Sequence, residues 1–377
     1  MKSFKIGLAL LLTVSLFAAA LSGCGDKTTV NKDGTKTIKT ENGIKITETA
    51  AKAGKTEKYE TADFSMTIPK GWKVTSGGIN IYHSIRVYDP DEPLNQMFIL
   101  LKADCLLHSE AGKAAWQYNY TAGNAQAAFL ANAPVLSNPS TENLFKIFPE
   151  YANFVEKYET SYAGYTFPRF DKFTVTDRYA SNNPLKSYAL GDELLRGTFT
   201  ENGKEGEGLF SASVVDFGSS SIASGPASGY VIPSADGGYY MAYNVVAVTA
   251  VKDTFIDWES LLTKCMSSLD YSESFVNATN QASNEKVALA KQISQNFNQI
   301  MDGMMSSWES RNKSQDIISQ KQSDATLGYE RVYDTETGEI YRASNGFTDV
   351  YDGKRYKSVT DDNMYTEPVS GYIERVK

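Results

Sequence analysis

The chain has few cysteines, few histidines and no excess of positive charge. Its 377 residues contain 3 Cys and 2 His, and 37 Lys and Arg stand against 45 Asp and Glu. So few cysteines exclude a disulfide-dense scaffold, and the acidic balance argues against a nucleic-acid partner, which needs a basic surface. Only one apolar run approaches membrane length, which excludes a polytopic membrane protein. The 41% hydrophobic and 12% aromatic residues predict a globular protein, at this length of about two domains.

Residues 1–23 are predicted to be a lipoprotein signal peptide. Two lysines precede an apolar run over residues 6–20, which is shorter than the ~20 residues of a membrane-spanning helix. The run ends in Leu21-Ser22-Gly23-Cys24, which resembles the lipobox of bacterial lipoproteins. The resemblance implies transfer of diacylglycerol to the Cys24 sulfur and cleavage before Cys24, which would place the protein on the outer face of the cytoplasmic membrane, anchored by lipid. The alternative is an ordinary cleaved signal with an incidental cysteine.

Residues 24–62 are predicted to be a flexible tether. Threonine, lysine and small residues dominate this segment, and no aromatic residue precedes Tyr59, so the segment cannot bury a core. One local pattern differs from the rest, because Asn42-Gly43 lies between alternating apolar positions within residues 37–46. An Asn-Gly pair in that setting is typical of a β-hairpin.

Residues 63–275 are predicted to form the main domain, with several strands. Phe64 to Ile68 alternates like a half-buried strand. Residues 193–199 and 207–217 flank Asn202-Gly203 and predict a long antiparallel hairpin. Residues 239–251 are apolar on both faces, which is typical of a central strand.

Helical patterns in the same domain cover residues 110–132, residues 141–158 with Pro149 inside, and a third stretch that Asp257 would cap. The Gly- and Ser-rich residues 218–238 are predicted to be a surface loop. This order of strands and helices predicts an α+β fold, a mostly antiparallel sheet with helices on one face.

Two resemblances to known families concern these strands. The segment from Phe64 to Trp72, which ends in Ile-Pro-Lys-Gly-Trp, is similar to the opening strand of PsbP-like domains. That similarity implies a sheet packed against helices and a docking or stabilising role, with no catalytic residues. Residues 85–90 and 328–341 resemble a lipoprotein family of Gram-positive bacteria that has no assigned activity.

The C-terminal part is predicted to contain a long amphipathic helix over residues 283–320 and a β-hairpin subdomain over residues 325–377. Apolar residues recur in the helix every three or four positions. In the tail, residues 331–333 and 340–342 predict one hairpin. Asp352-Gly353 predicts a second hairpin with a two-residue turn.

The sequence carries no strong catalytic signal. It contains no nucleophile elbow, phosphate-binding loop, dinucleotide fingerprint or zinc-protease helix, so we expect no metal and no cofactor. His83 and His108 lack spaced partners and are interpreted as structural histidines. Cys105 and Cys265 are interpreted as buried free thiols, with a disulfide bridge between them as the alternative.

Tyrosines of the tail are the candidate binding residues. On a sheet face they would stack on sugars or peptides of the cell envelope, whereas the alternative is ordinary cross-strand packing. The candidates are Tyr333, Tyr341, Tyr351 and Tyr356.

These features favour a non-enzymatic, lipid-anchored extracellular protein that binds or scaffolds an envelope protein or polymer. The main alternative is an extracellular hydrolase that uses carboxylates or a metal. A solute-binding lipoprotein is disfavoured, because such proteins repeat strand–helix units and this chain has an antiparallel pattern.

Overall fold

The computed structural model describes residues 27–30, 36–40, 45–50, 56–180, 187–252, 254–282, 313–367 and 369–375. Nearly all strand pairs in these ranges are antiparallel and helices are interspersed among them, which confirms the predicted α+β class. Among the helices described there, none is both long and apolar enough to cross a membrane.

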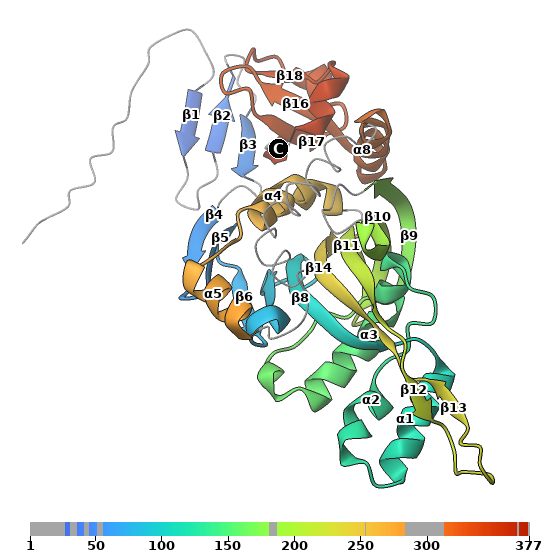
Figure 1. The fold of residues 1–377 in the computed structure, drawn as a ribbon. Helices are drawn as coiled ribbons and strands as arrows, with labels where there is room; N and C mark the ends of the chain where they lie inside the picture. Colours follow the sequence, from blue (N-terminus) through green and yellow to red (C-terminus); the bar gives the residue numbers. More distant parts are fainter. Residues whose placement is uncertain are drawn as a thin grey trace, which may run out of the picture.

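The main sheet orders seven of the described strands as β6-β7-β8-β14-β11-β10-β9, each antiparallel to its neighbours (Figure 1). β14 lies at the centre, as its apolar run predicts, and the predicted hairpin across Asn202-Gly203 joins β10 to β11. The strands are β6 (Lys73–Gly77), β7 (Ser84–Tyr88), β8 (Gln96–Leu107), β9 (Asp171–Ala180), β10 (Ala189–Glu201), β11 (Lys204–Gly218) and β14 (Tyr239–Val251).

Both faces of the main sheet are covered. Val245 and Ala247 of β14 pack into a cluster with helix α3 (Thr141–Tyr158), whereas Val246 and Val248 pack into a second cluster. The second cluster contains α4 (Phe255–Ser267). The prediction of helices on one face is therefore wrong, because a central strand that is apolar on both faces needs cover on both.

A small sheet in the order β15-β5-β4 shares the second face with α4, and α5 follows it along the chain. These elements are β4 (Thr56–Glu60), β5 (Phe64–Pro69), β15 (Asp270–Tyr271) and α5 (Glu273–Ala282).

The first face is filled by aromatic rings. The Phe210 ring centroid lies 4.8 to 5.9 Å from those of four other rings, all edge to face, which belong to Phe145, Phe170, Phe173 and Phe199. α3 contributes to this cluster over its whole predicted length, and Ser140 caps its first turn by accepting from the Asn143 N–H at 3.1 Å. Pro149 does not end the helix, because the rings buried on both sides of it offset the roughly 3 kcal/mol that an internal proline costs.

The predicted helix over residues 110–132 is two helices, α1 (Glu110–Thr121) and α2 (Ala128–Asn132), with Gly123 at a φ of 101° between them. Only glycine adopts that backbone conformation without strain, so the chain turns there. Short 3-10 helices connect other elements: η2 (Asn80–Tyr82), η3 (Ala125–Ala127), η4 (Thr160–Tyr162) and η6 (Asp362–Thr366).

A second sheet joins the two ends of the described chain, in the order β1-β2-β3-β19-β17-β16-β18. β3 is antiparallel to β19, and β19 is parallel to β17. The bounds are β1 (Lys27–Val30), β2 (Lys36–Lys39), β3 (Lys45–Ala50), β16 (Tyr329–Asp334), β17 (Ile340–Ser344), β18 (Tyr356–Ser358) and β19 (Val369–Arg375).

This second sheet differs from the predicted tether and tail. The described part of residues 24–62 forms paired strands, because Ile38 and Ile46 are fully buried in one core with Tyr341 and Ile373. The tail is therefore part of a shared sheet and not a separate set of hairpins. β16 and β17 do pair across the first predicted turn. The second predicted hairpin is wrong, because the chain forms helix α9 (Phe347–Val350) there to bury Phe347.

The predicted long helix lies mostly outside the described residues. Its described end is α8 (Lys313–Leu327), which continues past the predicted end at residue 320. On α8, Asp324 accepts from Arg331 Nε and from Arg342 Nε, both at 2.7 Å.

Arg342 also donates to Asp257 of α4 at 2.6 Å. The prediction that Asp257 caps its own helix is therefore wrong, because its carboxylate pairs with an arginine of another element. Burial raises the pKa of the Asp257 carboxyl although Arg342 opposes that shift. We call Asp257, Asp324, Arg331 and Arg342 the buried ion cluster, and it connects the second sheet to the main domain.

Candidate binding surface

Apart from the apolar run near the N-terminus, two segments are the longest in the chain without a charged residue or a histidine. They are residues 114–141 and 217–235, in a protein of which 22% is charged. The first segment contains most of α1 and all of α2, and the second contains most of a hairpin, β12 (Ser221–Ala223) and β13 (Ser234–Asp236). The two lie together at one end of the molecule (Figure 1). We call residues 114–141 and 217–235 the uncharged lobe.

Specific contacts hold the hairpin on α1. Trp116 Nε1 donates to the Gly237 carbonyl at 3.0 Å, and Asn119 Nδ2 donates to the Ala223 carbonyl at 2.6 Å. Gly112 lies so close to the hairpin that an added Cβ would be 2.3 Å from the Asp236 carbonyl oxygen. Since only glycine permits this approach, the hairpin has a defined position on the helix. Residues 218–238 lie at the surface, as the sequence predicts, but they contain a short hairpin and are not all loop.

Main-chain hydrogen bonds cross the tip of the hairpin. Ser228 N donates to the Val231 carbonyl at 2.8 Å and Val231 N returns a bond to Ser228 at 3.2 Å. Further down, Ser224 N donates to the Pro233 carbonyl at 2.8 Å. The turn uses Gly229 at a φ of 64°, which favours glycine. These bonds satisfy main-chain groups of the tip without help from a partner.

The tip exposes large apolar side chains. Relative exposure is 107% for Tyr230, 67% for Val231 and 61% for Ile232, so Tyr230 is fully exposed and the other two side chains are mostly exposed. Tyr120 of α1 is also exposed, on the helix that carries the hairpin. A contiguous exposed apolar patch on a folded protein commonly marks an interaction site.

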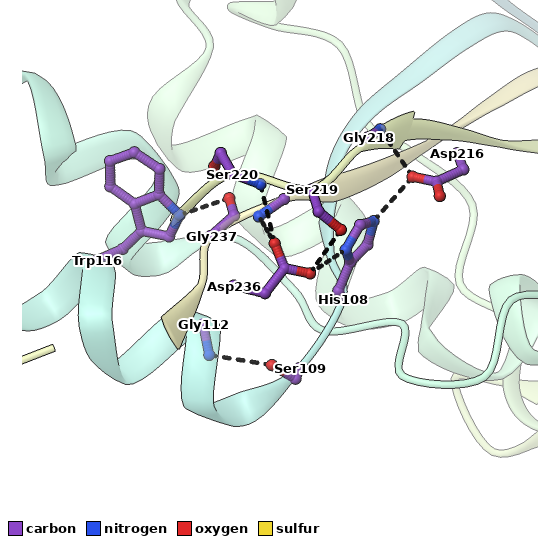
Figure 2. A network of polar contacts seen from close by, with 11 residues as sticks. His108, Ser109, Gly112, Trp116, Asp216, Gly218, Ser219, Ser220, Asp236 and Gly237 are labelled. Atoms are coloured by element: carbon purple, nitrogen blue, oxygen red, sulfur yellow. Dashed lines mark hydrogen bonds and ion pairs between the residues drawn. The ribbon is translucent and has the colours of Figure 1, made fainter. Parts of the chain in front are cut away.

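The base of the hairpin is fastened by a histidine (Figure 2). His108, just after β8, places Nδ1 2.8 Å from Asp236 Oδ2 and Nε2 3.1 Å from Asp216 Oδ1. Its ring centroid lies 4.1 Å from that of Tyr240. We call His108, Asp216 and Asp236 the histidine latch. Because Asp216 precedes the hairpin and Asp236 ends it, the latch fixes both strands of its stem to the end of β8.

Asp236 is the most strongly held member of the latch. Its carboxylate also accepts from Ser219 Oγ at 3.1 Å, from Ser220 N at 3.0 Å and from Gly238 N at 2.9 Å. The His108 hydrogen bond, followed by these backbone and hydroxyl donors, lowers the pKa of Asp236 to about 2. A carboxylate that is ionised and filled with donors at neutral pH acts as a structural acceptor and is a poor proton carrier.

The latch contains serine, histidine and aspartate but is not arranged as a nucleophile with its base. Ser219 donates to Asp236 and not to His108, and each ring nitrogen of His108 faces a carboxylate. Neither ring nitrogen faces a serine hydroxyl, so the arrangement lacks the contact between nucleophile and base that nucleophilic catalysis needs. Among the described residues, no group of three or more His, Cys, Asp or Glu is placed to hold a metal ion.

The predicted tyrosine site does not form an exposed face. Tyr341 and Tyr356 are buried in one core with Ile38, Ile46 and Phe347. Tyr351 stacks on Phe347 with ring centroids 5.0 Å apart, and Tyr333 is half-buried on β16. The alternative of internal packing describes at least the two buried rings. The lipidation residue, Cys24, lies outside the described residues.

The remaining candidates are structural. Cys105 and Cys265 are free thiols, as predicted, and Cys265 is buried. His83 packs against the Phe64, Tyr271 and Phe275 rings, and burial lowers its pKa to about 4.

Sequence reasoning missed the uncharged lobe although its signal is visible in the sequence. The signal is an absence, two long intervals without charge, and the sequence does not show that the two intervals meet in space. No family model, curated protein or solved structure matches the chain.

Proposed function

We propose that this protein is a lipid-anchored, non-enzymatic binding protein of the cell envelope, and that the uncharged lobe is its binding surface. The anchor would be Cys24, on the outer face of the cytoplasmic membrane. The observation that carries the proposal is the exposed apolar tip at Tyr230, Val231 and Ile232, held in position by the histidine latch. Membership in the Gram-positive lipoprotein family that the sequence resembles is part of the same proposal.

The arrangement of the chain supports this assignment. Lys27, three positions after Cys24, begins β1, and β1 lies at the opposite end of the molecule from the β12–β13 hairpin (Figure 1). An acyl anchor at Cys24 would therefore leave the uncharged lobe free to contact another component. The anchor and the contact surface would not compete for the same end of the protein.

The disposition of the acidic groups favours binding over hydrolysis. Asp324 lies between two arginines, Arg196 binds Glu207 at 2.7 Å, and Arg86 lies 3.5 Å from Glu201. A general base or acid must be within reach of a substrate and able to exchange a proton. Buried carboxylates paired with guanidinium groups stabilise the fold and do not meet that requirement.

The test is position-specific photo-crosslinking in intact cells. A photoreactive residue replaces Tyr230 at the tip or, as the matched control, the exposed Ile318 on α8. We expect adducts with an envelope component from position 230 and not from position 318. Adducts from neither position, or equal adducts from both, would contradict the lobe as the binding surface.

The anchor is tested separately. Mass spectrometry of the N-terminal peptide should find a diacylglycerol thioether at Cys24, and Cys24→Ala should release the protein into the medium. Native protein recovered from the medium with an unmodified Cys24 sulfur would overturn the anchored location.

A further inference from the structure

The exposed tip of the β12–β13 hairpin has the chemistry of a membrane-inserting element. We propose that the component bound by the uncharged lobe is a phospholipid bilayer, into which Tyr230, Val231 and Ile232 insert. This inference rests on the proposed function. The insertion would be shallow, reaching the boundary between head groups and acyl chains.

The first argument is the absence of charge. Residues 217–235 and 114–141 carry neither carboxylates nor basic groups, and the nearest acid on the hairpin, Asp236, is held at its base by His108. A charge brought close to a hydrocarbon layer loses hydration at a large cost in free energy. A surface meant for a protein partner has no need to lack both signs of charge over its whole extent, since protein interfaces have polar, solvent-accessible rims.

The second argument is the pairing of the tip backbone. An unpaired peptide group is costly in a lipid environment, because no water is present to bond it. Within the tip, Ser228 and Val231 exchange N–H···O bonds, and Ser224 bonds the Pro233 carbonyl. Val231 can therefore enter an apolar phase with its own main-chain N–H and carbonyl already bonded.

The third argument is the shape and identity of the side chains. The tip is convex and consecutive in sequence, so a deformable layer accommodates it without a preformed pocket. Val231 and Ile232 offer aliphatic surface, which a sugar cannot use well, and Tyr230 combines an apolar ring with a hydroxyl that suits the lipid–water interface. With an anchor at Cys24 at the other end, two contacts would hold the molecule lengthwise along the bilayer.

The experiment uses the mature chain, residues 24–377, with Cys24→Ala so that no acyl chain contributes. Binding to phosphatidylcholine vesicles is measured by sedimentation, and insertion is measured with Tyr230→Trp and brominated lipids that quench tryptophan fluorescence. Tyr188→Trp, at another exposed tyrosine outside the lobe, is the matched control. We expect added quenching for position 230 and none for position 188.

A double variant, Val231→Ser with Ile232→Ser, should bind the vesicles at least tenfold more weakly, because burial of one aliphatic side chain already accounts for about that factor. The corresponding change on α8, Ile318→Ser with Leu327→Ser, should leave vesicle binding unchanged. Binding should not weaken as salt increases, since the lobe has no charge to screen. All four side chains are exposed, so circular dichroism should show an unchanged fold.

The bilayer is overturned as the partner if vesicles do not bind, if the tip double variant binds as well as the parent chain, or if salt abolishes binding. A negative vesicle result together with protein or polymer adducts from position 230 in cells would leave the proposed function standing and remove only the bilayer. Vesicle binding together with an unmodified Cys24 would support the bilayer as the partner of the tip and would remove the lipid anchor from the proposed function.

Discussion

The buried ion cluster allows a quantitative test of how the second sheet is held to the main domain. Replacing Asp324 by Asn removes the charge that lies between Arg331 and Arg342, whose side chains are each 1% exposed. Breaking a buried ion pair by removing one partner typically costs about 3–5 kcal/mol, because the other charge stays buried. We expect a loss near 3 kcal/mol, the lower end, because Asp257 still pairs with Arg342 and the Tyr365 carbonyl still accepts from Arg331.

An exposed ion pair on the same helix supplies the matched control. Lys321 Nζ lies 2.6 Å from Asp362 Oδ1, and the two side chains are 42% and 63% exposed. Such pairs contribute about 0.2–1 kcal/mol, so Lys321→Ala should have a small effect. Urea unfolding gives the free energies, and hydrogen exchange of the β16 and β17 amides shows where stability is lost. If Asp324→Asn destabilises these strands no more than Lys321→Ala does, the cluster does not hold the second sheet in place.

Two further outcomes follow from the main domain. Phe210→Ala removes a fully buried ring from the aromatic cluster and should lower the free energy of unfolding by about 3–5 kcal/mol, measured by thermal or urea unfolding. Phe217→Ala, at an exposed ring, should lower it by less than about 1 kcal/mol. Equal losses would show that the cluster does not dominate the core. Because the pKa of Asp236 is lowered to about 2, its contribution to stability is complete above its unfolded pKa near 3.8 and is lost as the pH falls through 2. Exchange of the amides of residues 218–238 should therefore differ between the parent and Asp236→Asn at pH 5, and this difference should vanish near pH 2; a difference independent of pH would contradict the latch.

The parts of the fold that the sequence predicts are those with local signals. β14 and α3 have the bounds that their apolar patterns indicate, and Asn202-Gly203 forms a hairpin turn because its neighbours pair directly. The second sheet could not be predicted in this way. Its pairing of β3 with β19 joins opposite ends of the chain. The residues around Ile46 and around Ile373 give no indication that the two side chains share a core.

The same limit applies to the candidate surface. The tail tyrosines are candidate binders from the sequence because tyrosines on a sheet face stack on sugars or peptides, but burial of Tyr341 and Tyr356 depends on strands far away in sequence. The position of the hairpin depends on Gly112 and Trp116, which contact it across more than a hundred residues of chain. A glycine in a helix gives no sign in the sequence of which backbone approaches it.

If Cys24 carries the proposed lipid anchor, the pairing of β3 with β19 has a mechanical consequence. A pull on Cys24 reaches β1 at Lys27, the open end of its antiparallel ladder with β2, where Lys27 is opposite Lys39. Strands loaded at that end peel apart one hydrogen bond at a time, which needs little force. β1 would detach first and β2 next, although detachment of β2 also exposes the buried Ile38, before the load reached β3 and its C-terminal partner. Under tension these outer strands would unfold and lengthen the chain, while the aromatic cluster of the main domain stayed folded. When the tension was released, the same strands would pair again.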